Sequence, residues 1–410
     1  IGLVKNLKEE RMVYLSKSAI LNLSTKEHYK YSSNDESLLS PFLQPYWNTV
    51  VQWIPLFLAP NMVTFIGFLA LILGLAFQLY LCPDLESGLP SWSYFFGAWC
   101  CFFYQTMDAI DGKQARRTGA SSPLGELFDH GCDSIGSTFQ AMMMIEAIGT
   151  GRSYYSFLAL MLINGTFFTS IWEQYYTSTL RLHVLSGPTE GEFLVMILQV
   201  VAGAFGVEAF TSPKQWIINL MSGYGYLENP LFNCDNSGKF IVISMCVSTC
   251  IGMLSNAMVA IPYHWKLNPA KDYQLSPFIT VLPLFIHMIC FGTYLVVAEH
   301  IFNENNTVAL LTFGLITGYI VNRLVVARVT AVQTSYMYIM QIPTLIIFIL
   351  MIIGKSTFIY DASILYLMLA WTVLVYSHFI YYIIQDFCSV LNVNCLTLTK
   401  EQYNKLYKNL

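Results

Sequence analysis

Long apolar stretches constrain the fold of this chain more than any other feature of its sequence. The 410 residues are 55% hydrophobic and only 11% charged, whereas a soluble globular protein has about 25% charged residues. A helix needs roughly 20 apolar residues to cross a bilayer. Stretches near this length lie at 59–81, 93–110, 128–149, 154–178, 191–210, 239–261, 276–298, 306–327, 337–354 and 362–387. The sequence therefore predicts an all-α polytopic membrane protein with about ten transmembrane helices.

The positive charges predict how these helices are oriented. Lys and Arg collect in the cytoplasmic segments of membrane proteins. Of the 21 Lys and Arg residues, 17 lie on one side: in the two terminal tails, or in and beside the loops that follow the second, fourth, sixth and eighth apolar stretches. The opposite side has only Arg152, Lys214, Lys239 and Lys355. Both termini are therefore expected in the cytosol. The formal net charge of −4 argues against a nucleic-acid partner.

Four aspartates stand where the second apolar stretch ends and the third begins. The first two are three positions apart along the chain and the last two are four positions apart, so each pair shares one face of its helix. If the faces meet, the carboxylates need hard cations between them, and all-oxygen sites suit Mg²⁺ or Mn²⁺. Helix capping and ion pairs could explain one such aspartate but not four, because charges in apolar stretches are costly. In order, the pattern contains Asp108, Asp111, Gly112, Ala115, Arg116, Gly125, Asp129 and Asp133.

This pattern and its spacing resemble the signature of the CDP-alcohol phosphotransferase family, whose members are membrane enzymes that release CMP from a CDP-linked donor. The runs 111–117 and 123–133 are most similar to eukaryotic choline/ethanolamine phosphotransferases, and the similarity thins out after about Glu190. The resemblance implies transfer of phosphocholine or phosphoethanolamine from CDP-choline or CDP-ethanolamine to 1,2-diacylglycerol, which yields phosphatidylcholine or phosphatidylethanolamine and CMP. It also implies an enzyme of the endoplasmic reticulum or Golgi membrane whose active site faces the cytosol.

The resemblance assigns roles to the residues of the motif. Two Mg²⁺ ions, for which Mn²⁺ could substitute, would be held by Asp108, Asp111 and Asp129, with Asp133 completing the second site. Arg116 and Lys113 would contact the donor phosphates, since a guanidinium suits phosphate geometry. The cytidine or phosphate would lie against Asn61, Gly112 and Gly125, where two missing Cβ atoms allow a close approach. Each of these residues also has a purely structural explanation. Asn61 could simply begin a helix, the two glycines could end helices, and Arg116 could be a solvated surface charge.

The proton acceptor is expected to be His130. Histidine titrates near neutral pH, and in the choline/ethanolamine branch a histidine at the matching position is thought to take the proton from diacylglycerol. Other branches lack this histidine and use the last aspartate, here Asp133. Glu190 either faces His130 and orients it, as carboxylates do for catalytic imidazoles, or is only a first-turn glutamate stabilised by its helix dipole.

The chain divides into three parts on this interpretation. Residues 1–58 are a cytosolic tail with an interfacial helix near Pro45–Pro55. Residues 59–261 are the catalytic bundle. Residues 262–410 provide packing, lipid access, a homodimer surface and a cytosolic tail, because they carry no comparable charge cluster. Cys82 and Cys234 both fall on the predicted lumenal side, where a disulfide is compatible with the compartment but is not established by two loop cysteines.

Two other functions fit part of the sequence. A CDP-diacylglycerol-dependent enzyme such as a phosphatidylinositol synthase resembles the same motif, but such enzymes are usually shorter, with about six spans. An ion-coupled transporter also carries membrane aspartates, although it needs them near the middle of broken helices. Here they lie at helix ends beside Arg116, which favours the enzyme. The sequence does not decide between choline and ethanolamine.

Overall fold

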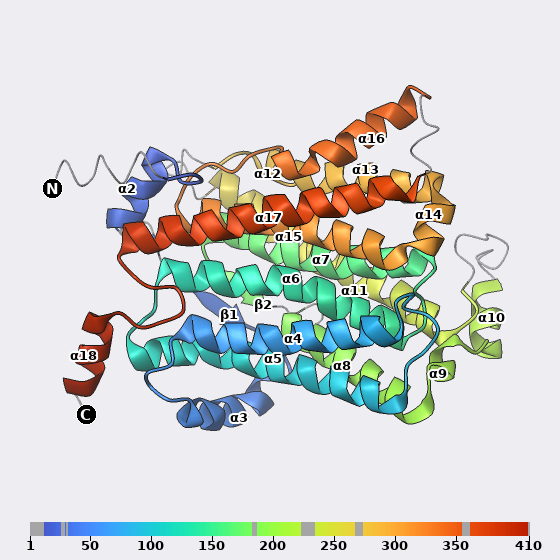
Figure 1. Ribbon diagram of the computed structural model, residues 1–410, viewed down its shortest axis with the longest axis horizontal. Coiled ribbons are helices and arrows are strands. Elements are labelled where there is room, and N and C mark those ends of the chain that lie inside the picture. Colours follow the sequence, from blue (N-terminus) through green and yellow to red (C-terminus); the bar gives the residue numbers. More distant parts are fainter. Residues whose placement is uncertain are drawn as a thin grey trace.

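The computed structural model describes residues 12–25, 29, 32–182, 187–222, 234–266, 274–354 and 361–408. Long helices running side by side form an elongated bundle (Figure 1). This confirms the predicted all-α polytopic fold. Among the described residues, seven helical segments are long and apolar enough to cross a membrane: Pro60–Leu81, Tyr154–Thr177, Pro188–Phe205, Ser237–Lys266, Pro277–Val297, Asn306–Val329 and Ala362–Leu391. The chain is thus an integral membrane protein.

The elements follow one another along the chain with short connections. In order they are α2 (Lys17–Thr25), β1 (Ser33–Asp35), α3 (Ser40–Trp53), α4 (Pro60–Leu81), α5 (Ser91–Thr118), α6 (Pro123–Ala147), α7 (Tyr154–Thr177), β2 (Leu180–Leu182), α8 (Pro188–Phe205), α9 (Glu208–Thr211), α10 (Gln215–Ser222), α11 (Ser237–Lys266), α12 (Pro277–Thr280), α13 (Leu282–Val297), α14 (Glu299–Glu304), α15 (Asn306–Val329), η1 (Ile339–Gln341), α16 (Ile342–Ile352), α17 (Ala362–Leu391) and α18 (Lys400–Lys408). The two short strands pair in parallel, with Ser33 opposite Leu180.

Helices α5 and α6 extend beyond the apolar stretches from which they were predicted. Helix α5 continues to Thr118 and ends at Gly119, whose φ of 65° is left-handed and whose N–H bonds back to the last turn. A left-handed glycine is a common helix end. Helix α6 begins at Pro123, after Ser122 accepts the N–H of Gly125, which is a serine N-cap followed by proline at the first helical position. All motif residues therefore lie on helices, joined by the turn 119–122.

Helix α6 lies at the centre of the bundle and is buried along most of its length. It packs against α4, α7, α8 and α15. Helix α15, from the predicted C-terminal part, packs against both α6 and α7 and is largely buried too. By contrast, α11 and α17 keep most of their apolar surface exposed. Figure 1 shows α2 and α18 at the left end of the bundle, where α5 ends and α6 begins. That end is called the junction end below.

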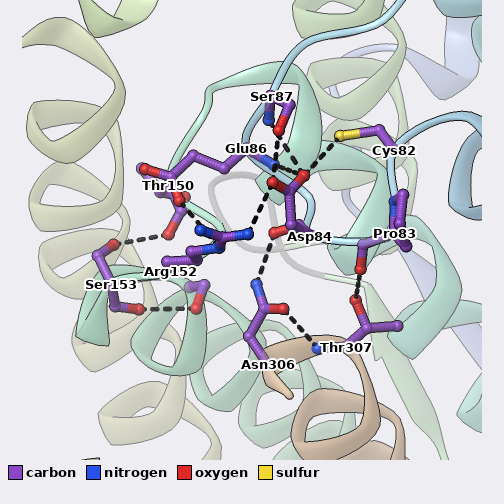
Figure 2. A network of polar contacts seen from close by, with 11 residues as sticks. Cys82, Pro83, Asp84, Glu86, Ser87, Thr150, Arg152, Ser153, Asn306 and Thr307 are labelled. Carbon is purple, nitrogen blue, oxygen red and sulfur yellow. Dashed lines mark hydrogen bonds and ion pairs between the residues drawn. The ribbon is translucent and has the colours of Figure 1, made fainter. Parts of the chain in front are cut away.

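At the opposite end of the bundle, polar contacts centred on Asp84 tie three connections together (Figure 2). The Asp84 carboxylate accepts from Arg152 of the α6–α7 connection, with Nη2 to Oδ2 at 3.0 Å. The Asp84 carbonyl accepts from Asn306 Nδ2 at the start of α15 (2.7 Å). Cys82 Sγ donates to Asp84 Oδ1 (3.1 Å). Cys82 and Cys234 are both buried and unpaired as disulfides, so the structure does not join them.

Replacing Asp84 with asparagine should lower thermal stability, and the loss should depend on pH. Burial alone would raise the pKa of Asp84, but hydrogen bonds from Ser87 and Cys82 outweigh it and hold the pKa below its usual range. A group with a depressed pKa stabilises the fold above its unfolded pKa of about 3.9, and this contribution is lost as the pH falls further. We expect a loss of about 1–3 kcal/mol at pH 7.

The measurement is the melting temperature of both proteins in detergent from pH 7 to pH 3. The difference between them should stay constant down to roughly pH 5 and shrink below about pH 4. Asp361→Asn is a matched control, because hydrogen bonds from Ser363 lower the pKa of this exposed cap of α17 as well, so its pH-dependent change should be the smaller of the two. A difference that does not change with pH would show that the Asp84 charge is unimportant.

Candidate metal and donor site

Three of the four motif aspartates converge between α5 and α6. Asp108 and Asp111 come from α5 and Asp129 from α6, and each offers a carboxylate oxygen within 4.8 Å of the others. Asp108 and Asp111 share a face because they are three residues apart on one helix. The side chain of Asp108 also interacts with Asp133, so the fourth aspartate adjoins the group. The two helix faces, each defined by the spacing of its aspartate pair, therefore meet.

Two hydroxyl groups hold the outer sides of this cluster. Thr64 of α4 donates to Asp111 Oδ2. Tyr104 donates to Asp133 Oδ1 at 2.7 Å, from one turn before Asp108 on α5. Neither residue was predicted to belong to the site. The position of Tyr104 was a usable signal, because residues four apart on a helix lie on the same face, whereas nothing local to Thr64 indicates its partner.

Two carboxylate oxygens of the cluster lack donors that would compensate for their burial. Asp108 Oδ1 and Asp129 Oδ1 are buried without a hydrogen-bond partner among the described residues. Adjacent carboxylates with unpaired oxygens repel one another, and each unmet acceptor costs free energy. A divalent cation provides both the missing charge and the missing ligand bonds, and oxygen donors suit Mg²⁺ and Mn²⁺. The residues present therefore fit a metal site.

The two motif glycines lie beside Asn61 and Arg116. A Cβ on Gly125 would come no closer than 3.6 Å to Asn61 Oδ1, and a Cβ on Gly112 no closer than 3.7 Å to Arg116 Nη1. These are ordinary contact distances, so packing within the protein does not require glycine at either position. Arg116 is exposed. Asn61 and the exposed guanidinium of Arg116 therefore lie beside the two glycines that flank the aspartate cluster.

Lys113 is placed differently from the prediction. Its Nζ donates to Gln44 Oε1 (2.7 Å) and to Asn48 Oδ1 (2.9 Å), both on α3. The ammonium group therefore fastens α3 to α5 and is not directed at the aspartates. The interfacial helix predicted near Pro45–Pro55 corresponds to α3, which buries Trp47 and leaves Trp53 exposed. Sequence spacing alone could not reveal this contact, because α3 precedes Lys113 by some 65 residues.

His130 lies in a buried polar cluster next to the aspartates. Its side chain is almost fully buried, and Nδ1 is 4.0 Å from Glu126 Oε1, one helical turn earlier. Glu126 also pairs with the buried Arg328 of α15 and accepts from Gln174 Nε2 at 3.2 Å. Glu126 is thus the carboxylate that the structure places nearest to His130. Arg328 could not be predicted, because it follows the motif by about 200 residues.

Glu190 lies in the first turn of α8, where it contacts the N-terminal segment of the chain. Its Oε1 accepts from Ser37 Oγ (2.6 Å) and from the Leu38 N–H (2.8 Å). The pairing of β1 with β2 brings this N-terminal segment to the beginning of α8, and the carboxylate caps the segment. The expected contact with His130 is not formed among the described residues. The first-turn alternative for Glu190 is consistent with its position, since it lies in the first turn of α8.

Comparison with known proteins places this site in a family. A family model described as CDP-alcohol phosphatidyltransferase matches residues 57–219, which include the whole motif. The chain is 32% identical over 405 residues to an uncharacterized CDP-alcohol phosphatidyltransferase class-I family protein of Dictyostelium discoideum, covering 95% of this chain and 99% of that protein. The chain belongs to the CDP-alcohol phosphatidyltransferase family.

Other similar members of this family have more specific names. The chain is 35% identical over 306 residues to choline/ethanolaminephosphotransferase 2 of Arabidopsis thaliana, covering 74% of this chain and 76% of that protein. It is 32% identical over 324 residues to cholinephosphotransferase 1 of Xenopus laevis, covering 76% and 74%. The family resemblance read from the motif is therefore confirmed, and the chain is a membrane-embedded CDP-alcohol phosphotransferase.

Proposed function

We propose that this family member transfers phosphocholine or phosphoethanolamine from the CDP-alcohol to 1,2-diacylglycerol, forming phosphatidylcholine or phosphatidylethanolamine and CMP. The observation that carries the proposal is the convergence of Asp108, Asp111 and Asp129 within 4.8 Å, in a helix pair where side-chain packing does not require glycine at Gly112 or Gly125. The names of the Arabidopsis and Xenopus relatives support the choice of alcohol and acceptor.

In this proposal the aspartates hold two Mg²⁺ ions, for which Mn²⁺ can substitute. Asp108, Asp111 and Asp129 are the ligands of the first ion, and Asp133 completes the second site. When bound, the ions would neutralise the donor pyrophosphate and the charge on the departing CMP. Thr64 and Tyr104 fix the orientations of Asp111 and Asp133 through their hydrogen bonds, as supporting residues commonly do around metal ligands.

The remaining site residues bind the donor and move a proton. Arg116 contacts the donor phosphates, and Asn61 lines the nucleotide space beside Gly125. The imidazole of His130 takes the proton of the diacylglycerol hydroxyl. The hydroxyl oxygen then forms a bond to the phosphorus that bears the alcohol, and the bond from that phosphorus to the CMP oxygen breaks. CMP leaves with the electron pair of the broken bond.

The proposal includes the setting of the reaction. We place the enzyme in the endoplasmic reticulum or Golgi membrane, with the junction end facing the cytosol, on the basis of the charge distribution. The exposed apolar faces of α11 and α17 would contact lipid or a second copy of the chain in a homodimer.

The test is CMP release by purified protein in lipid nanodiscs. We expect release from CDP-choline or CDP-ethanolamine only when both diacylglycerol and Mg²⁺ are present, with activity lost in EDTA and restored by added Mg²⁺. A parallel reaction with CDP-diacylglycerol and inositol tests the rival enzyme class. Activity in that reaction alone would overturn the proposed substrates, and competition between the two CDP-alcohols would establish which one is preferred.

Arg116→Ala should weaken donor binding selectively. A charge-assisted hydrogen bond to phosphate contributes about 1.5–3 kcal/mol, so the apparent KM for the CDP-alcohol should rise roughly 10- to 100-fold, while the KM for diacylglycerol changes little. Steady-state kinetics with each substrate varied in turn measure both values. Arg152→Ala, at the opposite end of the bundle, is the matched control. An equal rise in both KM values would indicate a folding defect and not a lost phosphate contact.

A further inference from the structure

A pocket with a mixed polar and apolar lining lies at the junction end, apart from the aspartates. Its volume is about 240 Å³, and it lies between the beginning of α2, the last turns of α15 and the segment that follows α15. Its lining includes Tyr14, Ser16, Ser18, Arg323, Gln333 and Ser335. The lining contains one permanent cation and several hydroxyl or amide groups but no carboxylate. None of these residues belongs to the proposed metal and donor site.

The cation of this pocket, Arg323, is held by aromatic rings. Its guanidinium carbon is 5.8 Å from the ring centre of Tyr14, 5.5 Å from that of Tyr338 and 5.6 Å from that of Phe379. Cation–π contacts use the face of a ring and do not occupy the five N–H donors of a guanidinium. The described residues provide a hydrogen bond with Tyr319 and no ion pair to Arg323.

One nearby carboxylate already accepts a hydrogen bond from the backbone. Asp386 of α17 accepts the N–H of Tyr14 at 3.0 Å, so it holds the N-terminal segment in place at the pocket wall. The guanidinium is thus oriented by rings, with donors left over, beside a wall that is itself fixed. This is the arrangement of a preformed anion site, because an oriented guanidinium suits phosphate and carboxylate ligands.

The first turn of α2 adds to the positive character of the pocket. Ser16 Oγ accepts the N–H of Ala19 at 3.2 Å as the helix begins, and the hydroxyl of Ser18 is 2.9 Å from that of Ser16. Both serines are exposed at the pocket. A helix N-terminus favours negative charge, and the hydroxyl proton that is not used between the two serines is a further donor. An oxyanion with several acceptor oxygens matches this set better than a neutral ligand does.

The segment that lines the pocket continues along the chain into a surface suited to lipid. Directly after Ser335, the side chains of Tyr336, Met337 and Ile339 are 65%, 47% and 53% exposed, and the apolar helix α16 follows. In a membrane protein such exposed apolar side chains contact acyl chains. We propose that this pocket binds a phosphate group, with the phosphate head group of an anionic lipid as the favoured source. The proposal is independent of the reaction catalysed at the aspartates.

Isothermal calorimetry on the full chain in detergent tests this, with dihexanoyl phosphatidate and glycerol 3-phosphate as probes and with CMP and Mg²⁺ present. Arg323→Gln should weaken phosphatidate binding at least tenfold. Ser16→Asp should do the same, because aspartate still caps α2 but brings a negative charge to the pocket. Arg152→Gln removes a charge of the same kind from the far end of the bundle and should bind as the wild type does. Unchanged binding of the CDP-alcohol donor checks that each variant is folded.

The outcomes separate the two sources of phosphate. Tighter binding of phosphatidate than of glycerol 3-phosphate supports the lipid, whereas equal binding supports a phosphate site that is filled from water and overturns the lipid source. Phosphatidate binding that survives in both Arg323→Gln and Ser16→Asp would overturn the proposal itself.

Discussion

Replacing Asp111 with asparagine should abolish CMP release while leaving the protein folded. Asp111 is one of the three carboxylates within 4.8 Å of one another, and it is positioned by the hydroxyl of Thr64. Asparagine keeps the size of the side chain but removes the charge that divalent ions require. Turnover should fall below detection at saturating Mg²⁺, and CDP-alcohol binding should lose its dependence on Mg²⁺. The melting temperature and the elution volume of the detergent-purified variant report on folding.

The matched control for this experiment is Asp361→Asn. It removes the same charge from the exposed beginning of α17, where the side chain only accepts from Ser363 N–H (2.8 Å). We expect activity at the wild-type level, since asparagine is also a good N-cap. Near-normal turnover of Asp111→Asn would contradict the assignment of this aspartate as a metal ligand.

His130→Ala should reduce kcat by about 10²–10⁴, the usual effect of losing a general base. Binding of the CDP-alcohol with Mg²⁺ should be retained, because His130 is not one of the residues that could hold the metal ion. Asp133→Asn should instead lose metal and donor binding together. Calorimetry for donor affinity, alongside turnover for each variant, separates the two roles.

Two further variants define what His130 does. His287 is another buried histidine, and its Nε2 lies 3.2 Å from the carbonyl oxygen of Phe313. His287→Ala should therefore lower stability without a selective loss of kcat. If His130→Ala turns over normally while Asp133→Asn binds donor but cannot react, the aspartate is the base. A kcat defect in Glu190→Gln that matches His130→Ala would mean that Glu190 leaves Ser37 and reaches His130 when substrates bind.

The sequence predicted the parts of this molecule that depend on local spacing. Helices such as α4 and α7 were predicted nearly to the residue, because a long apolar run is bounded by turn residues. That Asp108 and Asp111 share one helix face follows from helical periodicity, and the packing of α5 on α6 then brings Asp129 to that face. The ends of α5 and α6 were missed because those turns are polar, and hydropathy cannot distinguish a polar helix end from a loop.

Contacts between distant parts of the chain were not predictable in the same way. Glu190 contacts Ser37 because two three-residue strands pair across the molecule, and neither strand has a strong sequence pattern. Arg328 reaches Glu126 because α15 packs on α6, an arrangement set by the packing of whole helices. Lys113 was predicted as a phosphate contact from its neighbours in the motif, yet its partners are on α3. A residue's place in a motif did not decide its partners.

The Asp84 contacts at the far end of the bundle (Figure 2) have a consequence for where the nucleotide substrate enters and the product leaves. They fasten the α4–α5 and α6–α7 connections to the start of α15, so these helices are held together where they are farthest from the aspartates. On the proposed function, CDP-alcohol therefore arrives and CMP departs at the same end, where α5 and α6 join. Such one-sided exchange suits an enzyme that draws on and replenishes a single nucleotide pool, and it differs from a transporter, which must open alternately to two compartments.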